Sequence, residues 1–178
     1  TVDWGDEKTT TVTQWDSVNA THDYGTPGVH TINITGKIQG FRFTTTGDRL
    51  KIIDIGQWGV LNVGNNGSYF YGCSNLDVSA TDALNLTGTT DMESMFRDAA
   101  KFNQNISNWD VSNVEDMHSM FNGATNFNGN ISNWDVSSVT NMQWMFLRAS
   151  AFNQPLNNWN VSKVTNMAEM FRDATSFN

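Results

Sequence analysis

The residues of this sequence that could do chemistry are few and spread along the chain. A hydrolase would need two convergent carboxylates, or a nucleophile beside its base. Asp110 and Asp135 instead occupy the same place in two copies of a repeat, and the third copy carries Asn160 there. A carboxylate that recurs by repetition indicates a structural or surface position. We therefore expect no catalytic residues and no enzyme activity.

The histidines and the cysteine do not form a recognisable reactive site either. His22, His30 and His118 lack the close spacing of zinc ligands. Cys73 is the only cysteine, so no intramolecular disulfide can form, and no His or Lys stands near it in sequence. We interpret its thiol as a small buried apolar group.

Calcium is the metal whose ligand type is present. Asp3, Asp6 and the row of Asp110 and Asp135 supply hard carboxylate oxygens, so a structural calcium ion stays open as an alternative. Carboxylates solvated at turns explain the same residues more simply. We expect no metal site and no cofactor.

The charge of the chain excludes two classes of partner. The formal net charge is −8, and the ten Lys and Arg residues form no cluster. Such a surface repels phosphate backbones and anionic lipids. No apolar run approaches the roughly 20 residues that span a bilayer. We expect no nucleic-acid partner and no membrane insertion in this segment.

A period of 25 residues dominates the second part of the chain. Trp109, Trp134 and Trp159 recur at this spacing. A fixed period of this size means that similar units stack on one another. The eight methionines form four Met-x-x-Met pairs, which we expect to fill the core: Met92 and Met95, Met117 and Met120, Met142 and Met145, and Met167 and Met170.

The apolar spacing within one unit changes along its length. Trp109 and Val111 alternate as in a strand, whereas spacings of three and four from Val114 to Ala124 favour one or two helical turns. The sequence thus predicts an α/β repeat, a leucine-rich-repeat-like solenoid over residues 47–178. Before it, β-branched and aromatic runs at 9–13, 29–34 and 41–43 predict a short β-rich segment over residues 1–46.

Two rows of asparagines recur as regularly as the apolar residues. An inward Asn can bond the backbone of the neighbouring coil and form a ladder, whereas a solvated turn is the alternative. We favour the ladder for both rows, which are Asn103, Asn128 and Asn153, and Asn108, Asn133 and Asn158.

The repeat resembles a known family. The stretch from Phe102 to Val114, FNQNISNWDVSNV, followed by Asp116-Met117 and Met120-Phe121, is similar to BspA-type leucine-rich-repeat surface proteins. This resemblance covers about residues 70–178. It implies a secreted or cell-surface location and adhesion to a host, the matrix or neighbouring cells.

A second resemblance concerns the N-terminal segment. The stretch from Val2 to Asp6, VDWGD, and the stretch from Thr21 to Ile32, THDYGTPGVHTI, are similar to the PKD type of β-sandwich, of which only part is present. Modules of that type are spacers or binding modules of extracellular proteins. The segment is thus expected to act as an incomplete sandwich or as a cap of the repeats.

Two functions agree with these patterns. In the first, the chain is a non-catalytic adhesion or ligand-binding module whose partner is a protein or glycan, and the residues that vary between units give specificity. Trp144 and Leu147 stand where other units carry polar residues, so they are candidate binding residues together with Asp110 and Asp135. In the second, the chain is a purely structural spacer or fibre segment of a larger surface protein.

Overall fold

The computed structural model describes residues 1–14, 17–43 and 46–178, which form two compact units, Thr1–Lys37 and Ile38–Asn178. The division thus falls earlier than the expected one between residues 46 and 47. The reason is that Phe41 and Phe43 pack against the core of the second unit, where the Phe43 amide donates to Tyr69 O at 2.8 Å. The stretch 41–43, expected as a strand of the first segment, therefore belongs to the repeats.

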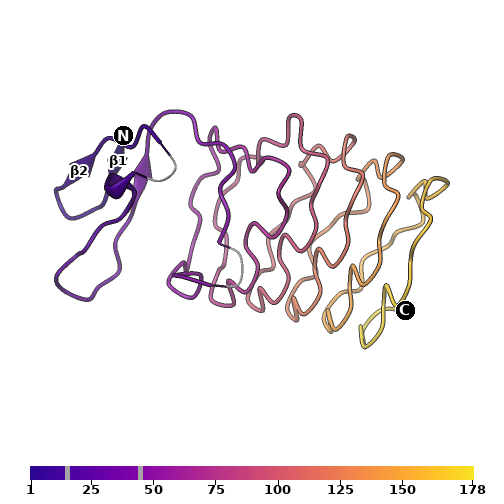
Figure 1. The fold of residues 1–178 in the computed structure, drawn as a ribbon. Coiled ribbons are helices and arrows are strands. Elements are labelled where there is room, and N and C mark those ends of the chain that lie inside the picture. Colours follow the sequence, from indigo (N-terminus) through magenta and orange to yellow (C-terminus); the bar gives the residue numbers. More distant parts are fainter. Residues whose placement is uncertain (15–16, 44–45) are drawn as a thin grey trace. The chain divides into compact units, whose positions relative to one another are not determined.

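The first unit contains a small antiparallel sheet (Figure 1). Strand β1 lies in the centre, where Val2 is opposite both Thr10 and Ile34. A single turn of 3₁₀-helix, η1, begins after Ser17, whose side chain accepts from the Asn19 amide. The elements are β1 (Val2–Asp3), β2 (Thr9–Thr10), η1 (Val18–Ala20) and β3 (Asn33–Ile34).

Aromatic and imidazole rings pack together in this first unit. The Trp4 and His22 rings stack at 4.9 Å, and those of Tyr24 and His30 at 3.8 Å. Asp6 Oδ2 lies 2.9 Å from His22 Nε2, and this hydrogen bond lowers the pKa of the Asp6 carboxyl below its usual value. Stacked rings and one charged pair therefore supply packing that two-residue strands alone do not.

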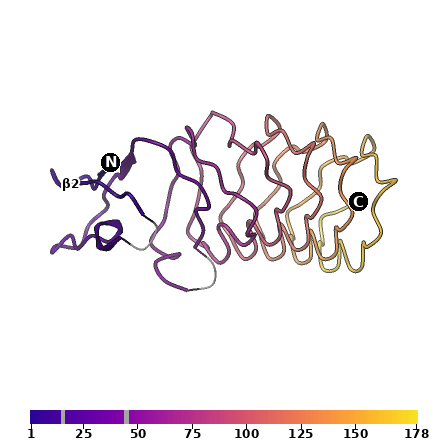
Figure 2. The same ribbon diagram turned by 45° about the horizontal axis from the view of Figure 1, so that its top comes forward.

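The second unit is a row of coils that lie side by side, and the predicted α/β plan is wrong (Figures 1 and 2). In the described residues of this unit there is no α-helix and no strand of two or more residues. Neighbouring coils are joined instead by single parallel β-bridges, in which Asp91 pairs with Asp116, Asp116 with Asn141, and Asn141 with Asn166. The stacking of units with a 25-residue period is confirmed, but their leucine-rich-repeat-like strand and helix are not.

Tight turns replace the expected helix between the paired methionines. The Met120 amide donates to Met117 O at 3.2 Å, and Ser119 between them has a left-handed φ of 55°. The Met117 and Ser119 amides donate across to Asn141 and Gln143 of the next coil at 3.0 and 2.9 Å. An α-helix would need all these amides for bonds within one segment. The spacing of three residues therefore reflects a turn whose third residue is left-handed, as in type II turns.

Phenylalanine side chains form the centre of the core. The rings of Phe96, Phe121 and Phe146 stack from coil to coil at 6.0 and 5.6 Å, and each is fully buried. A second column runs beside it, with Phe121 and Phe127 at 3.9 Å. Full burial of one such side chain contributes roughly 1.5–3 kcal/mol. The repeated phenylalanines thus give each coil the same apolar contact with its neighbours.

The methionines and the cysteine lie where the sequence predicts them. All the methionines except Met167, which is 41% exposed, are buried. Cys73 is also fully buried, and burial raises the pKa of its thiol to about 12. A thiol held in this protonated state is a poor nucleophile, which supports its interpretation as a core residue.

The tryptophan column is buried over two of its three members. Trp109 and Trp134 are each 4% exposed, whereas Trp159 is only partly buried. The Trp134 indole N–H donates to Ile106 O of the preceding coil at 3.0 Å, and Trp159 repeats this bond to Ile131 O at 3.1 Å. The indoles therefore contribute hydrogen bonds between coils as well as apolar area.

The two asparagine rows differ. Asn103 Oδ1 accepts from the Asn128 amide at 2.8 Å, and Asn128 Oδ1 accepts from the Asn153 amide at 2.9 Å, so the predicted ladder is confirmed in this row. The side chains of the other row are exposed and have no hydrogen bond within the described part of the chain. That row, Asn108, Asn133 and Asn158, is solvated, and the ladder predicted there is wrong.

Candidate ligand-binding surface

One residue breaks the pattern of the repeat at a strained backbone position. Trp144 has a φ of 58°, and the same place in the other coils is held by Ser94, Ser119 and Glu169 at φ values of 52°, 55° and 53°. Every copy therefore requires the left-handed conformation, which costs an L-residue roughly 1–2 kcal/mol. A bulky aromatic side chain in this conformation is uncommon.

The exposed part of the Trp144 side chain is apolar. Its ring centroid lies 5.4 Å from that of His118 in the preceding coil, at an interplanar angle of 41°. The indole Nε1 is inaccessible to solvent and has no hydrogen-bond partner among the described residues. Because the side chain is nevertheless partly exposed, the surface that it offers to solvent consists of carbon atoms.

Polar groups continue the same row across two more coils. His118 Nδ1 lies 3.5 Å from Glu93 Oε1, and the two side chains are 20% and 48% exposed. The turns that place them are alike, since the Glu93 amide donates to Asp91 Oδ1 and the His118 amide to Asp116 Oδ1, each at 2.7 Å. We call Glu93, His118 and Trp144 the Trp144 row.

The turns beneath this row carry negative charge. Burial raises the pKa of the Asp91 carboxyl, the nearby charges of Asp116 and Glu93 raise it further, and the hydrogen bond from the Glu93 amide lowers it. Asn141 Nδ2 donates to both carboxylate oxygens of Asp116. The surroundings of the Trp144 row are therefore acidic.

Leu147 lies in the same coil as Trp144. The Leu147 amide donates to Trp144 O at 3.1 Å, so the two residues are the ends of one tight turn. Both side chains are partly buried. Of the four binding residues expected from the sequence, these two share a local segment.

Asp110 and Asp135 lie elsewhere in their coils. Both are exposed, and both close a turn: Ser112 Oγ donates to Asp110 Oδ1 at 2.6 Å, and the Ser137 amide donates to Asp135 Oδ1 at 3.0 Å. These serines lower the pKa of each carboxyl. No hydrogen bond or ion pair of the described residues connects either aspartate with Trp144. The structure therefore does not gather all four residues into one site.

The carboxylates considered for calcium already have partners. Asp3 Oδ1 accepts from the Gly5 amide at 2.9 Å, and Asp6 Oδ2 lies 3.3 Å from Lys8 Nζ in addition to its contact with His22. Over residues 1–14, 17–43 and 46–178, no group of three or more His, Cys, Asp or Glu side chains is arranged to hold a metal ion. The same residues form no helix with the length and apolar character of a bilayer crossing.

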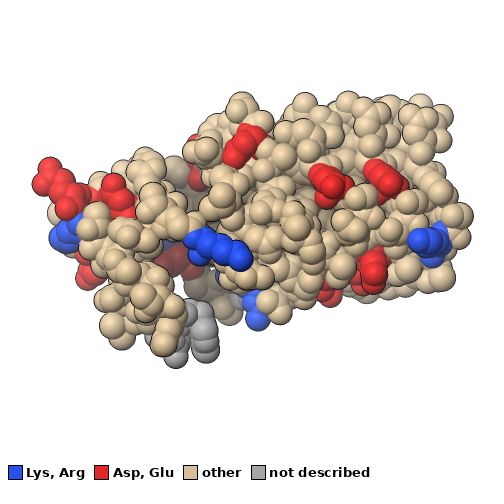
Figure 3. Space-filling model, turned by 90° about the horizontal axis from the view of Figure 1, so that it is seen from above, with Lys and Arg blue, Asp and Glu red and all other residues tan. Residues whose placement is uncertain are grey.

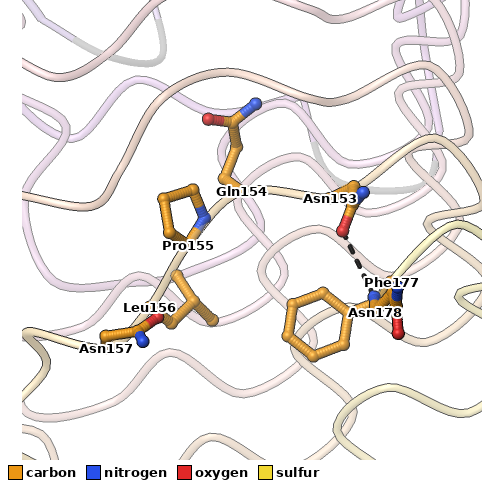
Figure 4. Close-up of a pocket in the computed structure, with 7 residues that line it drawn as sticks. All are labelled: Asn153, Gln154, Pro155, Leu156, Asn157, Phe177 and Asn178. Atoms are coloured by element: carbon orange, nitrogen blue, oxygen red, sulfur yellow. Dashed lines mark hydrogen bonds between the residues drawn. The ribbon is translucent and has the colours of Figure 1, made fainter.

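Two hollows lie at the last coil, and neither offers chemistry. In the first, shown in Figure 4, the Asn178 amide donates to Asn153 Oδ1 as the last rung of the asparagine ladder. The second is apolar. Their linings contain no titratable side chain: Asn153, Gln154, Pro155, Leu156, Asn157, Phe177 and Asn178 in the first, and Leu156, Trp159, Val161, Met167, Met170, Phe171 and Phe177 in the second.

Glu93 and His118 are the residues of this surface that the sequence did not single out as a site. Both stand at a repeat position that varies, which is the available signal. Their contact follows only when units of 25 residues are placed in register, because that register brings residues of successive coils side by side. The candidate surface is thus made by stacking and not by any local motif.

Comparison with known proteins identifies the repeats. The family described as "Mycoplasma protein of unknown function, DUF285" matches twice, over residues 41–128 and 90–178, which overlap and together cover more than half of the chain. No curated protein and no solved structure matches. Two overlapping matches to one family agree with a chain built from repeated units. The chain therefore belongs to the DUF285 family of Mycoplasma proteins of unknown function.

Proposed function

We propose that this chain is a non-catalytic binding module of a secreted or cell-surface protein. Its partner is a protein or glycan of a host, the matrix or a neighbouring cell, and it binds at the Trp144 row. The observation that carries the proposal is Trp144 itself, a partly exposed indole at a left-handed position where the other coils carry Ser or Glu. Strained residues that break a repeat mark candidate functional positions.

The regularity of the coils supports a local binding surface. Stacked units present the same groups once per coil, so a distinctive surface arises only where units differ. The positions that differ most lie in the turns around Trp144, where Glu93, His118, Gln143 and Ala168 replace one another. The resemblance to BspA-type surface proteins supports the location and the adhesive role.

The non-catalytic part of the proposal rests on how the polar groups are used. The exposed aspartates close turns, and Cys73 is buried as a thiol. A catalytic centre needs unlike groups that converge in a pocket. Neither of the two hollows contains a titratable side chain.

The test compares variants that take residues from sister coils. Purified chain is measured for binding to immobilised matrix proteins, glycans and whole cells by biolayer interferometry. Trp144→Ser reproduces the residue of two other coils and should weaken binding about tenfold or more, the effect of losing an aromatic anchor worth 1.4 kcal/mol. Asp135→Asn, which copies Asn160, is the control and should bind as the natural chain does.

Circular dichroism of each variant shows that the coils stay folded. Equal binding by Trp144→Ser and the natural chain would refute the Trp144 row as the binding surface. A chain that binds none of these targets would instead support the alternative role as a structural spacer.

A further inference from the structure

We infer that the Trp144 row recognises neutral hexopyranose units of a glycan chain. This inference rests on the proposed function, because it names the ligand class of the same surface. It is carried by three features: the carbon surface of the indole, the free hydrogen-bonding groups beside it, and the sign of the surrounding charge.

The indole offers a platform of the kind that sugar rings pack on. The Trp144 Nε1 is inaccessible to solvent, so the accessible part of the ring is apolar. The axial C–H groups of a hexopyranose form an apolar face that is complementary to the electron-rich face of an aromatic ring. Water is displaced from both surfaces when they meet.

Hydrogen-bonding groups lie next to this platform in the neighbouring coils. The Glu93 carboxylate is 48% exposed and lies beside His118 Nδ1, so it has lone pairs left for hydroxyl donors. No hydrogen bond of the described residues occupies His118 Nε2. A carboxylate and an imidazole along one edge of an indole can therefore bond adjacent hydroxyl groups of one sugar while its C–H face covers the ring.

The charge around the row selects against acidic glycans. Glu93, Asp91 and Asp116 would repel a sulfate or carboxylate, and the whole chain carries a net charge of −8. The guanidinium groups that could offset them are engaged, since Arg172 pairs with Glu169 at 3.0 Å and Arg148 donates to Asn122 at 3.3 Å. Charged side chains are also sparse on the face of the coils seen in Figure 3.

The same groups fit a basic protein segment less well. Of the carboxylates near the row, Asp116 already accepts from the His118 amide and Asn141 Nδ2, and Asp91 accepts from the Glu93 amide. Glu93 alone remains for a cation, and a single exposed ion pair contributes only about 0–1 kcal/mol. Trp144 also lies outside both hollows, so the platform suits internal units of a polymer more than an enclosed small ligand.

The experiment uses the full chain with three sets of probes. Neutral polysaccharides (mannan, β-glucan and dextran) are compared with acidic ones (heparin and polysialic acid) and with poly-lysine, by affinity electrophoresis and by calorimetry with oligosaccharides. The expected result is binding to at least one neutral polymer that varies less than twofold between 50 and 500 mM salt, because no charge is neutralised.

Matched variants locate the binding. Trp144→Ser should weaken it about tenfold or more, and Trp144→Phe should retain part of it because a platform remains. Glu93→Gln and His118→Gln introduce the residue of the sister position Gln143 and should each weaken binding by a few-fold. Asp135→Asn is the control.

The outcomes separate this inference from the proposed function. Trp144-dependent binding to poly-lysine, an acidic glycan or a matrix protein, without binding to any neutral polymer, would overturn the neutral-sugar inference and leave the proposed function standing. Absence of any Trp144-dependent binding would overturn both.

Discussion

Asn141 Nδ2 donates to both carboxylate oxygens of Asp116, at 3.3 and 3.1 Å. One coil earlier the equivalent pair lacks this donor, because Asp116 stands beside Asp91, and the negative charge of Asp116 raises the pKa of the Asp91 carboxyl. The same position in the stack thus stabilises one pair of coils and repels in the next.

This relationship predicts that Asp91→Asn stabilises the repeats at neutral pH. The folded-state pKa of Asp91 is raised, first by burial, so the folded state holds its proton to higher pH than the unfolded state does. Stability is therefore lost as the pH rises from the ordinary value of 3.8 through the raised folded value, and it stays lost above that. The variant should gain about 0.5 kcal/mol at pH 7, a figure discounted for solvent screening, and nothing below pH 3.8. Urea denaturation at both pH values measures this.

The control for that prediction is Asp135→Asn. The pKa of Asp135 is lowered by its bonds to Ser137, so its charge favours the folded state and its removal should give no gain. Destabilisation by Asp91→Asn at pH 7 would show that the carboxylate contributes a bond that the amide cannot replace.

A second prediction concerns the methionine core. Met120 is fully buried, so Met120→Asp would place an unpaired charge or a neutral acid among phenylalanines and should cost at least 3 kcal/mol, about the cost of the most damaging core substitutions. Met167→Asp is the matched control, because Met167 is 41% exposed. Thermal unfolding followed by circular dichroism should show a lost or greatly lowered transition for the first variant and a shift of a few degrees for the second. Similar melting of the two would contradict the burial of this row.

A third prediction compares the asparagine rows. Asn128 Oδ1 accepts from the Asn153 amide and from Gln154 Nε2, each at 2.9 Å, whereas Asn133 is exposed. Asn128→Ala should therefore cost about 1 kcal/mol, and Asn133→Ala less than about 0.5 kcal/mol. Chemical denaturation of both variants is the measurement. Equal losses would mean that the ladder adds nothing beyond what a solvated turn provides.

A fourth prediction concerns acid sensitivity of the first unit. The hydrogen bond from His22 lowers the folded-state pKa of Asp6. Its stabilising effect is therefore present above the ordinary pKa of 3.8 and is lost as the pH falls through the lowered value. Hydrogen exchange of the Thr9 and Thr10 amides should speed up in this acidic range for the natural chain, and Asp6→Asn should exchange faster already at neutral pH. Protection that is equal in the two chains at pH 7 would contradict a structural role for this pair.

The sequence predicted the repeat and its core because both depend on periodic apolar residues. Trp109 and Met120 recur every 25 residues, and only burial against neighbouring units explains such regularity. The helix was predicted wrongly because a spacing of three residues is common to a helical turn and to a tight turn. Only the positive φ of Ser119 separates the two, and a serine does not announce that conformation as a glycine would.

The candidate surface was predictable in part. Trp144 and Leu147 were visible as departures from the repeat, whereas Asp110 and Asp135 were included because they are charged and recur. The structure shows these aspartates in turns of their own and brings His118 to Trp144 instead. Contacts between coils depend on the register of stacking, and composition alone does not supply that register.

The most direct test of the central claim is an NMR titration that follows the side-chain signals of the tryptophans. Trp144→Ser assigns the Trp144 indole, and the buried indoles of Trp109 and Trp134 serve as internal controls. On addition of a polymer or partner that the chain binds, the Trp144 and His118 signals should shift while those of Trp109 and Trp134 stay unchanged. Binding that leaves the Trp144 and His118 signals unmoved, with shifts at Asp110, at Asp135 or in residues 1–37, would contradict the account.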